Sequence, residues 1–249
     1  MITPTSGTTA APVPTRFAGA VVVVAGGTGA LGAAVAQAFL DEGATVVIPQ
    51  REQGDVSARP RAAEASRRVA RSVDLASDDS VRKFFAELLA QHGRLDGVVN
   101  AVGGYVGGSS LWETDTAVLD RMFAANLRTG YTLFRAAIPA LLKQGRGALV
   151  NVAAKAGLDH PAGAAAYAAS KAGAIAMTDS LAADLLGTGV RINSILPSII
   201  DTAANRAAMP KANYAKWPKP QDIARVILFL CSDDAAVIHG AAIPVYGNG

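Results

Sequence analysis

Cysteine is almost absent from this chain of 249 residues, which contains only Cys231. A single cysteine excludes an internal disulfide and fits a reducing compartment, so we expect a cytoplasmic protein. Histidine is also scarce, and His92, His160 and His239 lack the spacing of metal ligands. Because no histidine is placed beside Cys231, we interpret this cysteine as buried packing. The sequence therefore predicts no metal site and no cysteine nucleophile.

A strong charge of either sign is missing as well. The chain has 23 basic and 20 acidic residues, a formal charge of +3 and a pI near 9.1, without a long basic run. This balance predicts neither a nucleic-acid partner nor a membrane surface, and leaves a small-molecule substrate. The basic cluster, which we interpret as a solvated loop and strand edge, is Arg59, Arg61, Arg67, Arg68 and Arg71.

Residues 18 to 40 carry no charge, which by length alone would fit a membrane span. Gly26, Gly29 and Gly32 interrupt this stretch after a run of valines, so it is better explained as a strand, a turn and a helix. Residues 1–15 have no apolar core of a signal peptide and are predicted to form a disordered tail.

Short β-branched runs alternate with helical patterns from residue 16 to residue 249. This rhythm predicts one α/β domain, a doubly wound Rossmann sheet of seven parallel strands with helices on both faces. The candidate strands are 21–26, 45–50, 67–73, 95–103, 147–154, 189–197 and 241–247. The candidate helices are 30–42, 78–92, 116–144, 165–187 and 220–231.

The segment AGGTGALG, residues 25–32, follows the first strand and opens the first helix. Glycines there permit a tight turn and let backbone amides approach a pyrophosphate, while the helix N-terminus adds partial positive charge. In this context the segment predicts dinucleotide binding beyond the carboxyl ends of the strands.

Tyr167 and Lys171 are one helical turn apart in the segment AAYAASKAGAIAMT. Residues at i and i+4 share a helix face, so the ammonium is expected to lower the phenol's pKa from its usual value near ~10. A phenol adjusted in this way can donate or accept a proton. Taken alone, the pair is also compatible with chance spacing.

These motifs together resemble the short-chain dehydrogenase/reductase family over nearly the whole chain, from Arg16 to Gly249. The resemblance implies an NAD(P)H-dependent oxidoreductase in which Tyr167 is the general acid that protonates the reduced substrate. It further implies that Lys171 binds the nicotinamide ribose and adjusts the phenol, and that Asn126 holds a water of a proton relay. By the same resemblance, the chain is expected to form a homodimer or homotetramer.

The family resemblance extends to the cofactor contacts. The glycine loop is similar to the family's TGxxxGxG with alanines at positions 25 and 30, residues 100–103 are similar to its NNAG motif, and residues 197–202 to its PGxxxT. The implied cofactor-binding set is Gly26, Thr28, Gly29, Leu31, Gly32, Gln50, Arg51, Asp74, Leu75, Asn100, Ala101, Val102, Tyr167, Lys171, Pro197, Ile200 and Thr202.

The end of the second strand selects between the two nicotinamide cofactors. An acidic residue there would accept hydrogen bonds from the ribose and repel a 2′-phosphate, but this chain has Gln50 followed by Arg51. A guanidinium can pair with the phosphate, so we expect NADP(H) to be preferred over NAD(H). Arg67 and Arg71 are expected to add to this positive field. In the alternative, Arg51 points to solvent.

One departure from the family is Ala154, which stands where the family has a catalytic serine. Losing one donor to a developing oxyanion costs about 2.7–4 kcal/mol in a well-studied hydrolase. We therefore expect a conjugated, quinonoid or activated carbonyl substrate, or a replacement donor such as Lys155. The alternatives are an ordinary 3-oxoacyl or polyol reductase and a nucleotide-binding scaffold without catalysis.

The segment 196–217 is similar to the corresponding region of dihydropteridine reductases, which also keep the tyrosine and lysine without the serine. A quinonoid dihydropterin is electron-poor and would need less help from a donor. The residues that could form a flat-ring pocket or a lid, with core packing as the alternative, are Tyr105, Trp112, Met209, Tyr214 and Trp217.

Overall fold

The computed structural model describes residues 15–51 and 65–248, and these form a seven-stranded parallel sheet in the order β3-β2-β1-β4-β5-β6-β7. This order confirms the predicted doubly wound Rossmann fold. The strands are β1 (Val21–Ala25), β2 (Thr45–Gln50), β3 (Arg68–Ser72), β4 (Gly97–Asn100), β5 (Gly147–Val152), β6 (Val190–Pro197) and β7 (Ala242–Val245). Each predicted strand is present, although most are shorter than the sequence pattern suggested.

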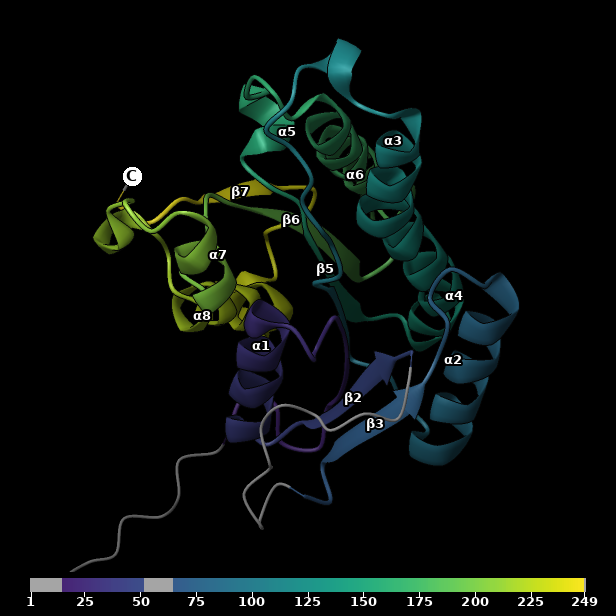
Figure 1. The fold of residues 1–249 in the computed structure, drawn as a ribbon. Coiled ribbons are helices and arrows are strands. Elements are labelled where there is room, and N and C mark those ends of the chain that lie inside the picture. The colour runs from purple at the N-terminus through teal and green to yellow at the C-terminus, as the bar shows by residue number, and fades with distance from the viewer. Residues whose placement is uncertain (1–14, 52–64, 249) are drawn as a thin grey trace, which may run out of the picture.

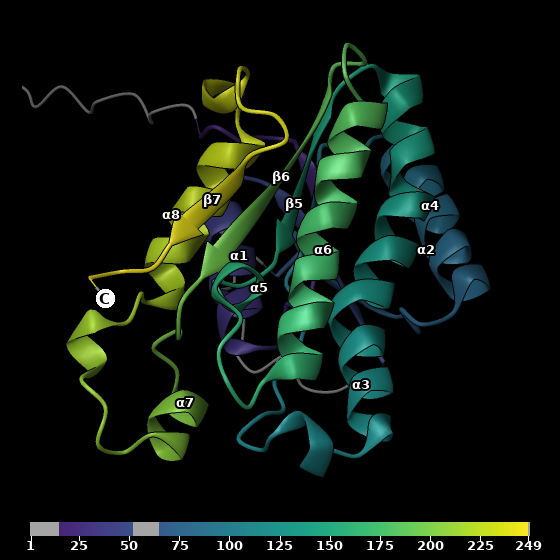
Figure 2. The same cartoon turned by 90° about the horizontal axis from the view of Figure 1, so that it is seen from above.

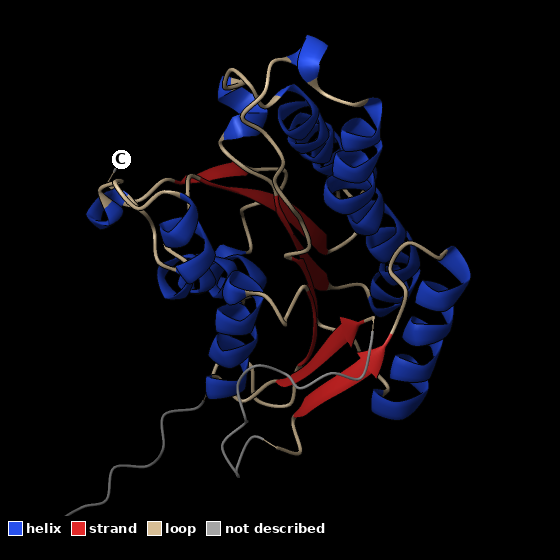
Figure 3. Ribbon diagram, in the orientation of Figure 1, coloured by secondary structure: helices blue, strands red, loops and turns tan. Residues whose placement is uncertain are grey.

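Helices cover both faces of the sheet, as Figures 1 and 3 show. The long helices are α1 (Ala30–Asp41), α2 (Asp78–His92), α4 (Thr129–Gln144), α6 (Ala165–Asp184) and α8 (Pro220–Cys231). The shorter ones are α3 (Thr116–Phe123), α5 (Ala156–Asp159) and α7 (Ala203–Ala208), with η1 (Leu111–Glu113), the π-helical η2 (Ala124–Arg128), η3 (Tyr214–Lys216) and η4 (Asp233–Ala235).

The alternation of side chains along β1 explains why the two faces are both buried. Val22 and Val24 pack into a core with α1 and α8, whereas Val21 and Val23 pack into a second core with α2 and α4. Successive side chains of a strand point to opposite faces, so a run of valines suits a strand that is covered on both sides.

The predicted helix 116–144 is not one regular helix. It consists of α3, the π-helical turn η2 and α4, and α3 and η2 run beside α6 (Figure 2). The short helices α5 and α7 were not predicted, because segments of this length carry little helical periodicity. The expected tail at residues 1–15 lies outside the described residues except for Thr15.

In the part of the chain that the structure describes, no helix is long and apolar enough to cross a membrane. The same residues contain no group of three or more His, Cys, Asp or Glu side chains arranged to hold a metal ion. Burial raises the pKa of the Cys231 thiol to about 12, so the thiol stays protonated at neutral pH.

Candidate active site

The glycine turn between β1 and α1 packs against the chain that leaves β4. Gly26 has a φ of +80°, and a Cβ placed on it would lie 2.7 Å from the carbonyl carbon of Ala101. A Cβ on Gly32 would lie 2.0 Å from the Gly26 carbonyl oxygen. Both positions therefore require glycine, and the turn brings the first N–H groups of α1 to the carboxyl ends of β1 and β4.

A series of hydrogen bonds between buried side chains holds the backbone where it leaves β4. The Asn100 side chain donates from Nδ2 to Asn151 Oδ1 at 3.0 Å and accepts from the Val102 N–H at 3.3 Å. Asn151 in turn donates to Thr178 Oγ1 of α6 at 3.1 Å. The expected cofactor residues Asn100, Ala101 and Val102 thus lie directly beside the glycine turn.

Tyr167 and Lys171 occupy the first two turns of α6. Lys171 is buried, and its Nζ donates to the Val152 carbonyl at the end of β5 at 2.9 Å. A Cβ on Gly103 would lie 3.2 Å from Lys171 Nζ and 2.8 Å from Asn126 Oδ1. The structure therefore brings Lys171 and Asn126 together around the loop that follows β4.

The pKa of Tyr167 moves in the opposite direction to the one expected from the sequence. Burial of the phenol, and secondarily the nearby Tyr105, raise the pKa of Tyr167 to about 12. Burial also lowers the pKa of Lys171 to about 8. Desolvation disfavours the charged form of each group, and neither of these two groups is a cause of the other's shift. Tyr167 is therefore fully protonated at neutral pH, which suits a proton donor.

Asn126 is a buried member of η2 and holds the loop after β4. Its Oδ1 accepts from the Gly104 N–H at 2.9 Å, and its Nδ2 donates to the Gly104 carbonyl at 3.0 Å and to Ser170 Oγ at 3.0 Å. Ser170 donates onward to the Tyr167 carbonyl at 2.8 Å. This role of Ser170 was not predicted from the sequence, in which only its position directly before Lys171 distinguishes it.

Ala154 is buried at the end of the β5 chain and offers no side-chain donor. Lys155, the replacement suggested by the sequence, pairs through Nζ with Asp159 at 2.5 Å and lies 5.5 Å from the centre of the Tyr246 ring. This pairing raises the pKa of Lys155 and directs its ammonium away from a donor role at position 154.

The segment after β6 is held by its own side chains. Arg206 forms a bidentate pair with Asp201 at 2.5 and 2.8 Å and lies 4.8 Å from the Tyr214 ring centre. Tyr214 packs against Trp217 with ring centres 5.0 Å apart. Of the suggested flat-ring residues, these two therefore contact each other, whereas Tyr105 contacts Tyr167.

The residues around α7 that were expected to bind the cofactor already make some hydrogen bonds within the protein. Thr202 caps α7 by accepting from the Asn205 N–H at 3.2 Å, and the Ile200 carbonyl accepts from the Asn205 side chain at 2.8 Å. Pro197 ends β6, and its carbonyl accepts from the Lys155 N–H at 2.9 Å. The hydroxyl hydrogen of Thr202 can still donate to a ligand.

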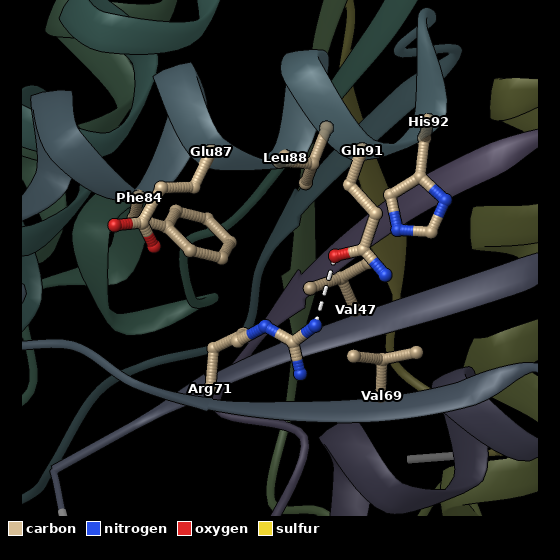
Figure 4. A pocket seen from close by; sticks show the side chains of 8 residues that line it. All are labelled: Val47, Val69, Arg71, Phe84, Glu87, Leu88, Gln91 and His92. Carbon is tan, nitrogen blue, oxygen red and sulfur yellow. Dashed lines mark hydrogen bonds between the residues drawn. The ribbon is translucent and has the colours of Figure 1, made fainter.

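Gln50 ends β2, and Arg51, which follows it, is exposed. Arg71 instead turns toward α2, where it donates to Gln91 at 2.9 Å beside a shallow hollow (Figure 4). Arg67 donates to the carbonyls of α1's last turn and of Ala44 at 2.8 and 2.9 Å. The side chains of Arg67 and Arg71 therefore stabilise the fold. Arg59 and Arg61, the first two arginines of the basic cluster, lie outside the described residues.

Asp74 and Leu75, two residues of the expected cofactor-binding set, follow β3. The backbone N–H of Asp74 donates to Ser80 Oγ at 3.0 Å, and the Leu75 carbonyl accepts from Thr132 Oγ1 at 2.6 Å. In the glycine turn, Thr28 is exposed and Leu31 packs into the core with α1. The structure thus places these residues at the same edge of the sheet. Their binding of the cofactor stays a prediction.

This strand order, with a glycine turn after β1 and a tyrosine–lysine pair on α6, defines a dinucleotide-binding oxidoreductase. The profile of a family described as enoyl-(acyl carrier protein) reductase matches residues 26–247. A meso-2,3-butanediol dehydrogenase of Serratia marcescens is 34% identical over 94% of this chain and 95% of its own length. The chain belongs to the short-chain dehydrogenase/reductase family and is an NAD(P)-dependent enzyme that acts on a small molecule.

Other similar proteins are consistent with this family. The 3-oxoacyl-[acyl-carrier-protein] reductase of Thermotoga maritima is 28% identical over 94% of this chain and 98% of its own. A solved structure, ElxO with NADP bound, is 24% identical with a TM-score of 0.86, covering 92% of this chain and 97% of its own. At that identity the structural likeness supports the fold.

Proposed function

We propose that this enzyme is an NADP(H)-preferring reductase of activated carbonyl compounds, with Tyr167 as the general acid. The observation that carries the proposal is a half-buried Tyr167, with its pKa raised to about 12, one helical turn from the buried Lys171 and with Ala154 in place of a second donor. The glycine turn fits a dinucleotide, because Gly26 and Gly32 let it pack closely on Ala101 and on itself, which brings the N-terminus of α1 to the carboxyl end of the sheet.

The nicotinamide cofactor supplies a hydride when it is bound. The chain's own residues handle the proton: Tyr167 gives its phenol proton to the substrate oxygen on which negative charge develops. Lys171, held by the Val152 carbonyl, provides a positive charge whose field stabilises the resulting phenolate. Asn126 fixes the loop at Gly104, which closes one side of the site.

The missing serine favours substrates whose carbonyl carbon is already electron-poor. In a vicinal diketone the neighbouring carbonyl withdraws electrons and stabilises the developing alkoxide, so a second donor matters less. The similar enzyme of Serratia marcescens is named for a vicinal diol, which supports this substrate class. A quinonoid dihydropterin meets the same electronic criterion and is the second candidate.

The test is to follow NADPH oxidation with butane-2,3-dione, a quinonoid dihydropterin and butan-2-one as the unactivated control. We expect the dione to be reduced with a kcat/KM at least ~10²-fold above that of butan-2-one, because one oxyanion donor is absent. Equal turnover of dione and butan-2-one would contradict the activated-carbonyl assignment. NADPH binding without turnover of any of the three would instead support the scaffold alternative.

Arg51 is expected to set the cofactor preference. Replacing Arg51 with aspartate should lower kcat/KM for NADPH by about 10- to 100-fold, because a charge-assisted contact worth about 1.5–3 kcal/mol is lost. The same substitution should raise kcat/KM for NADH, since a carboxylate can accept from the ribose hydroxyls. Arg82→Asp on the exposed face of α2 is the matched control. Unchanged NADPH kinetics in Arg51→Asp would contradict the proposed preference.

The enzyme is further proposed to be a homodimer or homotetramer through the surface of α3, α4 and α6. A cavity of about 440 Å³ lies between α3, the segment that precedes it and the start of α6, lined among others by Leu119 of α3 and by Ala165 and Ala169 of α6. Ala165 and Ala169 flank Tyr167 by two residues on each side, which places them on the opposite face of the helix. Sedimentation velocity should show an oligomer that Leu119→Arg dissociates, and a wild-type monomer at micromolar concentration would contradict this.

A further inference from the structure

Two polar side chains of the site, Ser170 and Lys155, already have hydrogen-bond partners within the protein. Ser170 Oγ donates to the Tyr167 carbonyl and accepts from Asn126, and Lys155 pairs with Asp159. Ala154 has no polar atom to offer. A second hydrogen bond to a substrate oxygen therefore has to come from another group.

Tyr105 is the hydroxyl-bearing side chain that packs directly on Tyr167. Their ring centres are 4.9 Å apart with the planes at 80°, an edge-to-face contact. Tyr105 is 64% exposed, so a substrate can reach it. Within the described residues, its hydroxyl group makes no hydrogen bond.

The position of Tyr105 is fixed from both sides. Asn126 binds both backbone groups of Gly104, the preceding residue, at 2.9 and 3.0 Å. The Gly108 N–H donates to the Gly163 carbonyl at 2.8 Å, which ties the other end of the segment to the turn before α6. The phenol lies across Gly107, where a Cβ would come 2.4 Å from the Tyr105 hydroxyl oxygen. The glycine thus leaves room for the ring beside Tyr167.

We propose that the Tyr105 hydroxyl supplies the second hydrogen bond at this active site, donating to the substrate oxygen that receives the proton of Tyr167. This inference rests on the proposed function. In the reduction, the hydride forms the new C–H bond and the C=O π pair moves onto oxygen. That oxygen then takes the Tyr167 proton. Tyr105 keeps its own proton throughout and stabilises the negative charge as it develops.

The test combines Tyr105→Phe with Ala154→Ser. Tyr105→Phe retains the ring contact and should lower kcat for butane-2,3-dione about 10- to 100-fold, with KM changed less than about threefold, because the lost bond is made mainly in the transition state. Adding Ala154→Ser to this variant should restore at least about tenfold in kcat. Ala154→Ser alone should raise kcat by less than it does in the Tyr105→Phe background.

Tyr131→Phe is the matched control, since Tyr131 is an exposed tyrosine of α4, and its kcat should equal that of the wild type. Gly107→Ala, which retains the hydroxyl but displaces the ring, should lower kcat in the same direction as Tyr105→Phe. NADPH titration by fluorescence and thermal unfolding show whether each variant is folded and binds cofactor.

The outcomes separate this inference from the proposed function. A wild-type kcat in Tyr105→Phe, while Tyr167→Phe is inactive, overturns the role of Tyr105 and leaves Tyr167 as the acid. A loss confined to KM, or a loss in kcat that Ala154→Ser does not restore, also overturns it, because packing would then explain the effect. Full activity of Tyr167→Phe would contradict the proposed function itself.

Discussion

Replacing Tyr167 with phenylalanine is expected to lower kcat for carbonyl reduction by about 10²- to 10⁴-fold, the range of a lost general acid. The aromatic ring stays, so its edge contact with Tyr105 at 4.9 Å is retained. The removed atom is the phenol oxygen, whose proton is held firmly because burial raises the pKa of Tyr167 to about 12. Stopped-flow measurement of NADPH oxidation under single-turnover conditions isolates the chemical step.

The direction of the pH dependence provides a second check. With a pKa of about 12, Tyr167 stays protonated from pH 6 to pH 9, so any loss of the wild-type reduction step in this range should follow the deprotonation of Lys171 near pH 8 and not the ionisation of Tyr167. The reverse reaction, alcohol oxidation, requires the phenolate and should accelerate as pH rises. A Tyr167→Phe variant with kcat within threefold of the wild type would contradict the assignment of the acid.

Lys171 is expected to make the stability of the folded protein rise with pH. Burial lowers the pKa of Lys171 in the folded chain to about 8, from an ordinary value of 10.5. Between these two values the unfolded chain binds a proton that the folded chain does not, so the free energy of unfolding increases with pH. Below pH 8 both states are protonated and the slope disappears. From pH 7 to pH 9.5 this group should contribute about 2 kcal/mol.

The measurement is urea unfolding at several pH values between 7 and 9.5 for the wild type and Lys171→Met. The variant should lack the contribution of Lys171, so the wild type should gain about 2 kcal/mol relative to it across this interval. Lys143→Met, at an exposed position of α4, should follow the wild type. Parallel pH curves for the wild type and Lys171→Met would show that Lys171 is not desolvated in the folded enzyme. The raised pKa of Tyr167 acts in the opposite sense only above pH 10.

The fold could be predicted because its signals are local. The valine run of β1 and the glycines that follow it specify strand, turn and helix within a dozen residues, and the remaining strands repeat that pattern. The spacing of Tyr167 and Lys171 likewise places both on α6. The direction of the Tyr167 pKa could not be predicted, because the spacing of Tyr167 and Lys171 does not reveal the burial that raises this pKa.

The partners of several site residues also could not be predicted, since they are distant in the sequence. Tyr105 and Tyr167 are brought into contact only when the loop after β4 meets the start of α6. Arg71 was expected to add to the field at the cofactor, but its guanidinium reaches Gln91 of α2. The loss of the serine at position 154 was visible in the sequence, whereas the neighbours that surround Ala154 required the fold.

The π-helical turn η2 has a consequence for insertions and deletions. A π turn holds one more residue than an α turn, and that extra residue lets Asn126 face Gly104. Deleting Ala125 would allow a continuous α-helix from Thr116 onward, in which an α turn replaces the π turn and the side chains on both sides keep their phase. Met122, Leu133 and Phe134 would then stay in the core, whereas the wide turn that presents Asn126 to Gly104 would be lost. A one-residue deletion here is therefore expected to affect the loop after β4 more than the packing of α3 and α4.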